Sequence, residues 1–334
     1  MKHLALLLTL PLLLTTPAHA HLPPAAPTGI THTPLETLAE GFRFTEGPAL
    51  ASDGSIYFSD IPNQRIHRYD PATNQTTVAM ENSQGANGIV IFADQDLESD
   101  ILITCQGRGK RVSYGLIDST TKQVDPSDLL PAKAFVTPQD LKNPVTPFNG
   151  PNDLVQDKHE GIYFTDPAYG NKVDPENRIE GVFYWSFERL PVRLITTLKR
   201  PNGIALSPDG HTLYVADNHA AEIYAFPVLE PGKLGPGKLF LDLAPLGKRF
   251  ATPQHKRTGG NPDGMTFDPQ GNLYIALFGQ GILVVTPQAP RPKVLGFIDS
   301  GDVTTNCTFA ADGKTLYITA NRALLRTQVT LTAD

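Results

Sequence analysis

Six short apolar segments recur along the chain, and this repeat constrains the fold more than any other feature. Each segment is rich in β-branched and aromatic residues, as β-strands are, and successive segments lie 43 to 61 residues apart. One such step holds about four short strands, which is the size of one β-propeller blade. The repeat therefore predicts an all-β fold, a six-bladed β-propeller. The segments are 55–58, 100–103, 161–164, 212–215, 272–275 and 315–318.

Tight-turn dipeptides precede most of these segments. They supply the positive φ angles that short hairpins need. Each apolar segment is therefore predicted to be the second strand of a hairpin. The 30 prolines and 28 glycines of the chain suit an all-β fold with many loops. The dipeptides are Asp53-Gly54, Glu160-Gly161, Asp209-Gly210, Gln270-Gly271 and Asp312-Gly313.

The C-terminal end of the chain provides too few strands for a complete sixth blade. The last candidate strand is the segment 324–331. Closing a propeller ring removes exposed sheet edges, so another part of the chain must fill the gap. We expect residues 34–39 to complete the last blade beside the C-terminal strands.

The first twenty residues have the pattern of an export signal. Lys2 and His3 give a positive start, residues 4–14 form an apolar run, and Ala18-His19-Ala20 offers small residues at the cleavage position. The run is too short to span a membrane. We expect a cleaved signal peptide over 1–20 and one six-bladed β-propeller domain over 21–334 that is periplasmic or secreted, with no membrane attachment after processing. An uncleaved amphipathic extension is the alternative.

Composition narrows the kinds of partner. Apolar residues make up 40% of the chain and charged residues 19%, which allows a large core. The net charge is −6, and no basic stripe predicts nucleic-acid binding. No pattern indicates an obligate protein partner. Cys105 and Cys307 lie in repeats that are not neighbours, so two buried thiols are expected rather than a disulfide.

An oxygen-bearing side chain opens the first strand of every repeat, 11 to 15 residues before the centre of the second strand. The innermost strands of a propeller line its channel, so equivalent positions point at one axis. Carboxylate and amide oxygens are ligands that Ca²⁺ accepts, whereas a ring without His or Cys disfavours zinc. We predict one divalent cation, Ca²⁺ by preference, balanced by Glu46 and Asp263. The six ring residues are Glu46, Asn87, Asn152, Asn202, Asp263 and Asn306.

A structural interpretation of the ring residues is also open, because Asn and Asp before Gly commonly form turns. The register of all six positions favours metal binding. Three further aspartates, Asp60, Asp166 and Asp217, each follow a second strand. Their repetition predicts structural hydrogen bonds in the blade turns rather than catalysis. The chain has no Gly-x-Ser-x-Gly elbow, which argues against a serine hydrolase.

Segments around the ring residues resemble the SMP-30/gluconolactonase/LRE family, and its gluconolactonase branch in particular. The resemblance runs nearly the length of the chain after the signal and implies a six-bladed propeller with one catalytic divalent cation. It implies metal ligands at Glu46, Asn202 and Asp263, and it places Asn152 beside both metal and substrate. The segments are 44–48, 150–154, 163–170, 200–205, 262–265 and 305–309.

Two segments leave the identity of the substrate undetermined. The gluconolactonase branch usually has Cys-x-His-Gly-x-Arg-Arg in the second blade, whereas residues 105–111 read Cys-Gln-Gly-Arg-Gly-Lys-Arg, without histidine. The basic insert 248–261 is expected either to shape the pocket mouth or to be a solvated loop.

These features predict an enzyme that opens a small lactone, a sugar lactone such as gluconolactone. Asp263 is the predicted catalytic base, and a water on the cation is its alternative. Asn87, Asn152 and Asn306 are predicted to contact substrate, and Tyr169 with Phe278 either forms an apolar wall or packs in the core. A metal-dependent phosphotriesterase or aryl esterase, and a non-catalytic propeller that binds a ligand, remain open.

Overall fold

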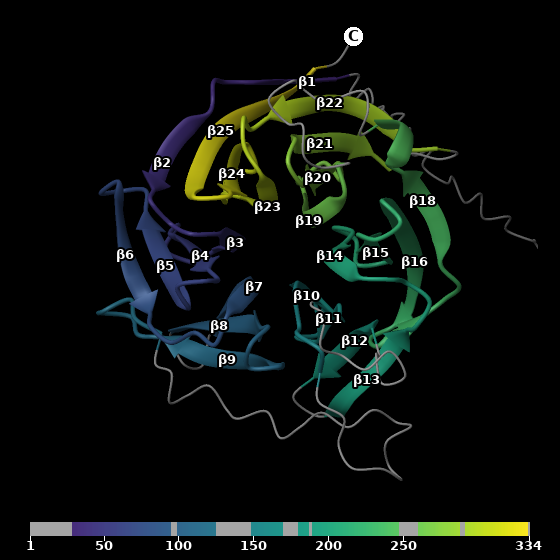
Figure 1. Cartoon of the computed structure of the whole chain (residues 1–334), viewed down its shortest axis with the longest axis horizontal. Helices are drawn as coiled ribbons and strands as arrows, with labels where there is room; N and C mark the ends of the chain where they lie inside the picture. Colours follow the sequence, from purple (N-terminus) through teal and green to yellow (C-terminus); the bar gives the residue numbers. More distant parts are fainter. Residues whose placement is uncertain are drawn as a thin grey trace, which may run out of the picture.

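The computed structural model describes residues 29–94, 99–124, 148–169, 180–186, 189–246, 260–287 and 291–332. Its strands form six antiparallel sheets around one axis, which are the six blades of a β-propeller (Figure 1). The predicted fold is therefore confirmed. The predicted signal peptide, most of the insert 248–261 and the segment 170–179 lie outside the described residues.

The first three blades follow one another along the chain. Blade 1 contains β3 (Thr45–Leu50), β4 (Ile56–Asp60), β5 (Arg65–Asp70) and β6 (Gln75–Met80). Blade 2 contains β7 (Ala86–Asp94), β8 (Ser99–Gln106) and β9 (Arg111–Ile117). Blade 3 contains β10 (Leu154–Gln156), β11 (Ile162–Asp166), β12 (Gly181–Ser186) and β13 (Arg189–Ile195).

The last three blades continue the ring. Blade 4 contains β14 (Pro201–Leu206), β15 (Thr212–Asp217), β16 (Glu222–Glu230), β17 (Lys233–Leu234) and β18 (Lys238–Asp242). Blade 5 contains β19 (Pro262–Phe267), β20 (Leu273–Leu277), β21 (Gly281–Thr286) and β22 (Lys293–Asp299). Blade 6 contains β23 (Thr304–Phe309), β24 (Thr315–Ala320), β25 (Ala323–Thr332), β1 (Gly29–His32) and β2 (Glu36–Glu40).

The predicted hairpins are present in the order expected. The six apolar segments supply β4, β8, β11, β15, β20 and β24, the second strand of each blade. At the first hairpin, Asp53 Oδ1 accepts a hydrogen bond from Ser55 N at 3.0 Å, and Gly54 has a φ of 83°. Both features are typical of a tight turn in which a short polar side chain bonds the backbone two residues on.

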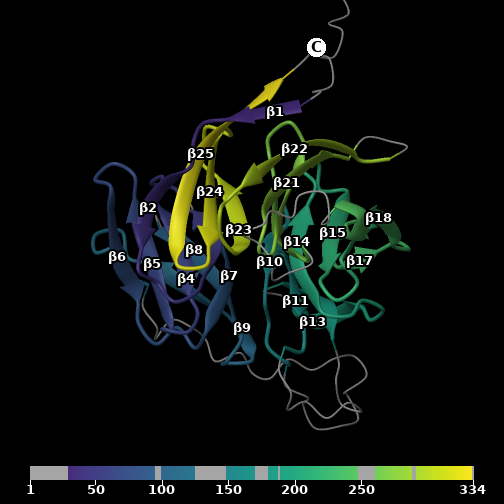
Figure 2. The ribbon, with the colours of Figure 1, turned by 45° about the horizontal axis from the view of Figure 1, so that its top comes forward.

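The N-terminal segment closes the ring, as predicted. Strand β2 pairs with β25 with Glu36 opposite Arg326, and β1 pairs with the outer part of the same strand. In Figure 2 this outer part and β1 project beyond the blades. Because β25 also pairs with β24, the first and last parts of the chain share one sheet. The closure therefore covers an edge that would otherwise be exposed.

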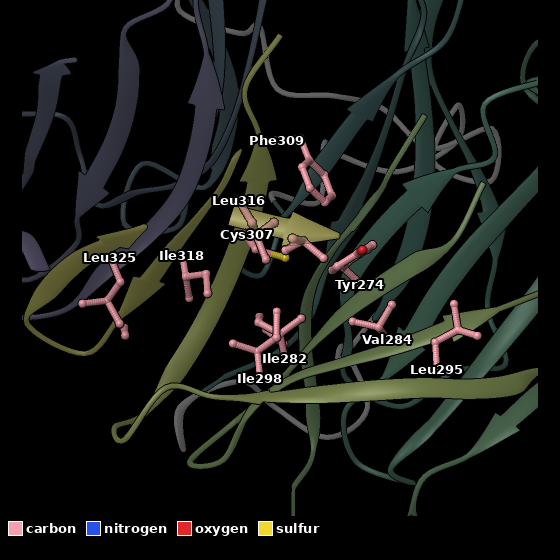
Figure 3. Packing of buried hydrophobic residues seen from close by; sticks show 13 residues of the cluster. Tyr274, Ile282, Val284, Leu295, Ile298, Cys307, Phe309, Leu316, Ile318 and Leu325 are labelled. Atoms are coloured by element: carbon pink, nitrogen blue, oxygen red, sulfur yellow. The ribbon is translucent and has the colours of Figure 1, made fainter. Parts of the chain in front are cut away.

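The core is divided into apolar clusters between neighbouring blades. Figure 3 shows the cluster between blades 5 and 6, where Tyr274, Ile282 and Ile318 pack with Cys307. Cys105 lies in a separate cluster that joins blades 2 and 3. Both thiols are buried and free, which confirms the prediction for the two cysteines.

Candidate active site

The six ring residues lie where the innermost strands depart from regular pairing. Register shifts occur beside five of them, in β3, β7, β14, β19 and β23, and Asn152 lies just before β10. A β-bulge bends a strand and changes the direction of a side chain. The ring residues of β3, β7, β14 and β19, each followed by a glycine, therefore lie in strand bulges beside the axis. The alternative interpretation of these ring residues as turn residues is wrong.

A glycine follows four of the ring residues because the next blade passes very close. A Cβ atom on Gly203 would collide with the carbonyl oxygen of Asp263, and one on Gly47 would collide with the carbonyl oxygen of Asn87. On Gly264 it would collide with the side chain of Asn306. Only a residue without a Cβ lets neighbouring blades bring their ring residues this close together.

Buried hydroxyl groups tie three pairs of neighbouring blades together at the same level. Ser59 Oγ donates to Asn87 O at 2.7 Å, and Thr165 Oγ1 donates to Asn202 O at 2.8 Å. Thr305 Oγ1 donates to Thr45 O at 2.8 Å, which joins the last blade to the first. Because these bonds hold the backbone at or beside ring residues, they limit how far those side chains can move.

The ring opens into a cavity of about 580 Å³ at one end of the axis. Five ring residues line it, and Asn306 does not. A second cavity of about 400 Å³ includes Asn306, Asp153 and Cys307. The structure thus places Asn306 apart from the lining of the larger cavity. That lining is Phe44, Glu46, Asn87, Asn152, Tyr169, Asn202, Asn218, Asn261, Asp263 and Phe278.

Three carboxylates are buried together beside the axis. Glu46, Asp153 and Asp263 are each less than a tenth exposed. Burial, reinforced by the charges of Asp263 and Asp153, raises the pKa of Glu46 well above its usual range. Burial and the charge of Asp153 also raise the pKa of Asp263, and burial raises the pKa of Asp153 to about 7. The cluster is therefore costly when all three groups are charged, unless a cation compensates them.

The donor set fits a hard divalent cation. Within the described ranges, no three His, Cys, Asp or Glu side chains are grouped as a metal site by themselves, so amide oxygens have to contribute. Asn152 and Asn202 line the same cavity as Glu46 and Asp263. Asn202 donates its amide nitrogen to Tyr169, at 2.7 Å, which leaves its oxygen for a ligand. Two carboxylates with two amides are oxygen donors of the kind that Ca²⁺ accepts.

Tyr169 and Phe278 belong to the wall of the cavity. Tyr169 is 49% exposed, so packing in the core does not describe it. Its hydroxyl accepts the hydrogen bond from Asn202, and the guanidinium of Arg200 lies 5.7 Å from its ring centre. Burial and the charge of Asp263 raise the pKa of Tyr169 further above its usual range.

The three aspartates after the second strands are structural, as predicted. Asp60 Oδ1 accepts hydrogen bonds from the backbone of Arg43 and Phe44. Asp166 accepts them from Asn149 and Gly150, and Asp217 accepts one from Lys199. In each blade the carboxylate thus holds the segment that leads into the innermost strand, just before the ring residue.

Several residues of the site were missed by the sequence analysis. Asp153 and Phe44 lie one or two positions from a ring residue, and Asn218 follows Asp217; that proximity was the available signal. Asn261 ends the insert 248–261, which was expected either to shape the pocket mouth or to be a solvated loop. No sequence pattern pointed to Glu180. Its carboxylate accepts hydrogen bonds from Ala168 N and Arg200 N, both at 3.0 Å, and so joins the segments that carry Tyr169 and Asn202.

The segment 105–111, which lacks the expected histidine, contains a buried glutamine that holds it through hydrogen bonds. Gln106 is fully buried, and its Oε1 accepts hydrogen bonds from Arg111 Nε at 2.6 Å and Ser113 Oγ at 3.0 Å. No residue of 105–111 is among the described residues that line the larger cavity. Of the insert 248–261, only Gly260 and Asn261 are described, so its predicted role stays a prediction.

Comparison with known proteins agrees with the predicted family and fold. The family profile described as the SMP-30/Gluconolactonase/LRE-like region matches residues 44–322. A gluconolactonase from Zymomonas mobilis is 30% identical over 305 residues, which is 88% of this chain and 81% of that protein. Lactonase drp35 from Staphylococcus aureus strain USA300 is 32% identical over 253 residues, or 75% of this chain and 68% of that protein.

Solved structures of similar shape include a gluconolactonase from Xanthomonas campestris. It has a TM-score of 0.71 and 24% identity, and the match covers 92% of this chain and 98% of that one. Regucalcin from Agrobacterium tumefaciens, a calcium-binding protein, has a TM-score of 0.65 and 18% identity, covering 90% and 93%. The family profile spans most of the chain, and this protein belongs to the SMP-30/gluconolactonase/LRE-like family.

Proposed function

We propose that this protein is a metal-dependent lactonase that opens a small sugar lactone such as gluconolactone, with one Ca²⁺ ion as its cofactor. The observation that carries the proposal is the cavity at the axis, where two buried carboxylates and three asparagines from five successive blades converge. The gluconolactonase and lactonase relatives support the reaction class. The calcium-binding neighbour supports a cation of this type.

The residues of the cavity would divide the reaction among them. Glu46, Asp263, Asn152 and Asn202 would hold the cation, which when bound supplies a positive charge that polarises the lactone carbonyl. Asp263 would also take the proton from the attacking water, because a carboxylate within hydrogen-bond reach can act as a general base. Asn87 would orient the ring through amide hydrogen bonds.

An aryl esterase is the second candidate. Phe44, Tyr169 and Phe278 bring three aromatic rings to the same cavity, and such a wall suits an aryl leaving group. The two candidates share the cation and the base, so they differ in the preferred substrate rather than in mechanism.

A panel of substrates with and without chelator tests the function. The panel contains D-glucono-δ-lactone, δ-valerolactone, dihydrocoumarin, phenyl acetate and a phosphotriester. We expect lactone hydrolysis that a chelator abolishes and added Ca²⁺ restores. Faster turnover of phenyl acetate than of any lactone would favour the aryl esterase, and hydrolysis of nothing in the panel would favour a propeller that only binds a ligand.

We also propose that the protein acts outside the cytoplasm. The support is the export pattern in the first twenty residues. Within the described residues, no helix is long and apolar enough to cross a bilayer. Mass spectrometry of the native protein should find a chain that begins at His21, and a retained Met1 would contradict the proposal.

A further inference from the structure

Two asparagines at the cavity use their amide nitrogens to join blades 4 and 5. Asn218 follows β15 and donates from Nδ2 to Pro262 O at 3.0 Å. Asn261 precedes β19 and donates from Nδ2 to Asn218 O at 2.9 Å. A backbone carbonyl can only accept hydrogen bonds, so the nitrogen of each side-chain amide must face it. The side-chain carbonyl oxygens therefore lie on the other side of each amide.

These two carbonyl oxygens have no donor within the described part of the chain. Both side chains are half-buried and line the cavity beside Asn202 and Asp263. An amide oxygen that loses its hydrogen bonds to water without gaining another hydrogen-bond donor weakens ligand binding. A ligand that fills the cavity therefore either donates hydrogen bonds to them or leaves them unsatisfied.

The charges of the cavity favour the same kind of ligand. Among the described lining residues, the only charged groups are the carboxylates of Glu46 and Asp263. In the proposed function a dication would balance both carboxylates, so the loaded cavity has no net charge that favours an ionic ligand. With the side-chain oxygens of Asn218 and Asn261 on its blade 4 and 5 side, the cavity suits a neutral ligand that carries O–H donors.

We propose that Asn218 and Asn261 are specificity-determining residues that accept hydrogen bonds from hydroxyl groups of the lactone. The inference rests on the proposed function and deepens it. It states that the side of the substrate facing blades 4 and 5 carries O–H donors. A lactone with hydrogen or alkyl groups there leaves both oxygens unpaired, and a site built for hydrogen bonds rejects such an analogue strongly.

Two lactones that differ only in their substituents test the proposal. D-glucono-δ-lactone carries hydroxyl groups, and δ-valerolactone has the same ring without substituents. We expect kcat/KM of the Ca²⁺-loaded protein to be at least about 100-fold higher for gluconolactone. Asn218→Leu and Asn261→Leu should each lower this preference by about tenfold, while kcat/KM for valerolactone changes by less than about twofold.

The control is Gln328→Leu, which also replaces a hydrogen-bonded amide by leucine, but at an exposed position of β25 that does not line the cavity. It should leave the preference unchanged. Equal kcat/KM of the unaltered protein for the two lactones would overturn this inference and leave the lactonase function standing. Hydrolysis of neither lactone would instead refute the proposed function.

Folding defects in the leucine variants can be recognised by their melting temperature. Equal loss of activity toward both lactones at an unchanged melting temperature would show that the two asparagines do not read hydroxyl groups. A variant that melts at a lower temperature is assayed below its own transition, where the ratio of the two kcat/KM values does not depend on the fraction of folded enzyme.

Discussion

At the residue scale, Asp263 and Glu46 occupy similar buried positions but are expected to have different tasks. Each supplies one of the two negative charges that line the larger cavity. Ca²⁺ affinity depends on the charge of its ligands, so Glu46→Gln and Asp263→Asn should both weaken Ca²⁺ binding by orders of magnitude. Isothermal titration calorimetry with Ca²⁺ measures this directly, without a substrate.

The two variants should differ when excess Ca²⁺ is supplied. Glu46→Gln should recover lactonase activity, because only the affinity for the cation is reduced. Asp263→Asn should stay inactive, because it also lacks the proposed base. Equal recovery of both would mean that Asp263 is a ligand only. Full activity of either variant without added Ca²⁺ would place the catalytic centre elsewhere.

His67 in β5 is expected to make the fold sensitive to acid. Its ring packs against those of Phe42 and Phe58, and its buried Nε2 has no partner among the described residues. Burial lowers the pKa of His67, so the unfolded chain binds the proton more readily. Stability should therefore fall as the pH drops below about 6.5, the ordinary pKa of histidine.

Urea unfolding of His67→Phe measures this effect. With Ca²⁺ present, the free energy of unfolding of the variant should fall less between pH 7 and pH 5 than that of the unaltered protein. His211→Phe, at an exposed histidine, is the matched control and should leave the pH dependence unchanged. An identical pH dependence in His67→Phe would contradict the prediction.

At the scale of elements, the pairing of β2 with β25 should contribute to the stability of the whole ring. Deleting residues 31–38 would remove half of β1 and three of the five residues of β2 from this edge and expose β25. We expect a large drop in melting temperature and cooperative loss of all blades. Glu36→Gln breaks only the exposed ion pair with Arg326, so it should cost less than about 1 kcal/mol. Unchanged melting of the deletion variant would show that closure is dispensable.

Glu180 should position the cavity wall through two loops at once. Glu180→Gln leaves only one oxygen for the N–H groups of Ala168 and Arg200, so one of the two loops loses its support. Losing a hydrogen bond to a charged group costs about 1.5–3 kcal/mol, and we expect kcat/KM to fall by at least about tenfold. The double variant that combines Glu180→Gln with Tyr169→Phe should lower kcat/KM by less than the product of the two single reductions. Both substitutions act on the same contact with Asn202.

The control for this prediction is Glu222→Gln in the same blade as Asn202. Glu222 accepts a hydrogen bond from Tyr224 on β16, away from the cavity. It should not change kcat/KM. Multiplicative effects of Glu180→Gln and Tyr169→Phe would indicate that Glu180 serves the fold only.

At the scale of the whole molecule, the sequence repeat predicted the six blades and five of the residues that line the larger cavity. Local backbone geometry decided which other residues reach it. Sequence register gives the position along a strand, but a bulge decides which of two neighbours faces the axis. Asp153 shows this limit. It takes the position that glycine holds in four other blades, and its carboxylate lies close to Gly88 of the preceding blade. Glu180 lies outside the repeated positions, so no periodic pattern in the sequence marks it.

The cluster of Glu46, Asp153 and Asp263 leads to a last prediction, for the protein without its cation. The pKa of each of these groups is raised in the folded state, so the folded protein binds protons more readily than the unfolded chain. Their contribution to stability is therefore present at low pH and is lost as pH rises through the folded pKa, which is about 7 for Asp153. The chelated protein should melt at a lower temperature at pH 8.5 than at pH 6.5.

Saturating Ca²⁺ should remove most of this difference, because a ligand that binds only the folded state stabilises it and the positive charge compensates the carboxylates. Differential scanning calorimetry at both pH values, with chelator and with Ca²⁺, measures the four melting temperatures. Mg²⁺ at the same concentration is the control, since its demand for regular octahedral geometry fits a mixed set of protein oxygens poorly. If the chelated protein were equally stable at both pH values, the three carboxylates would not form the costly anionic cluster from which we infer a cation site.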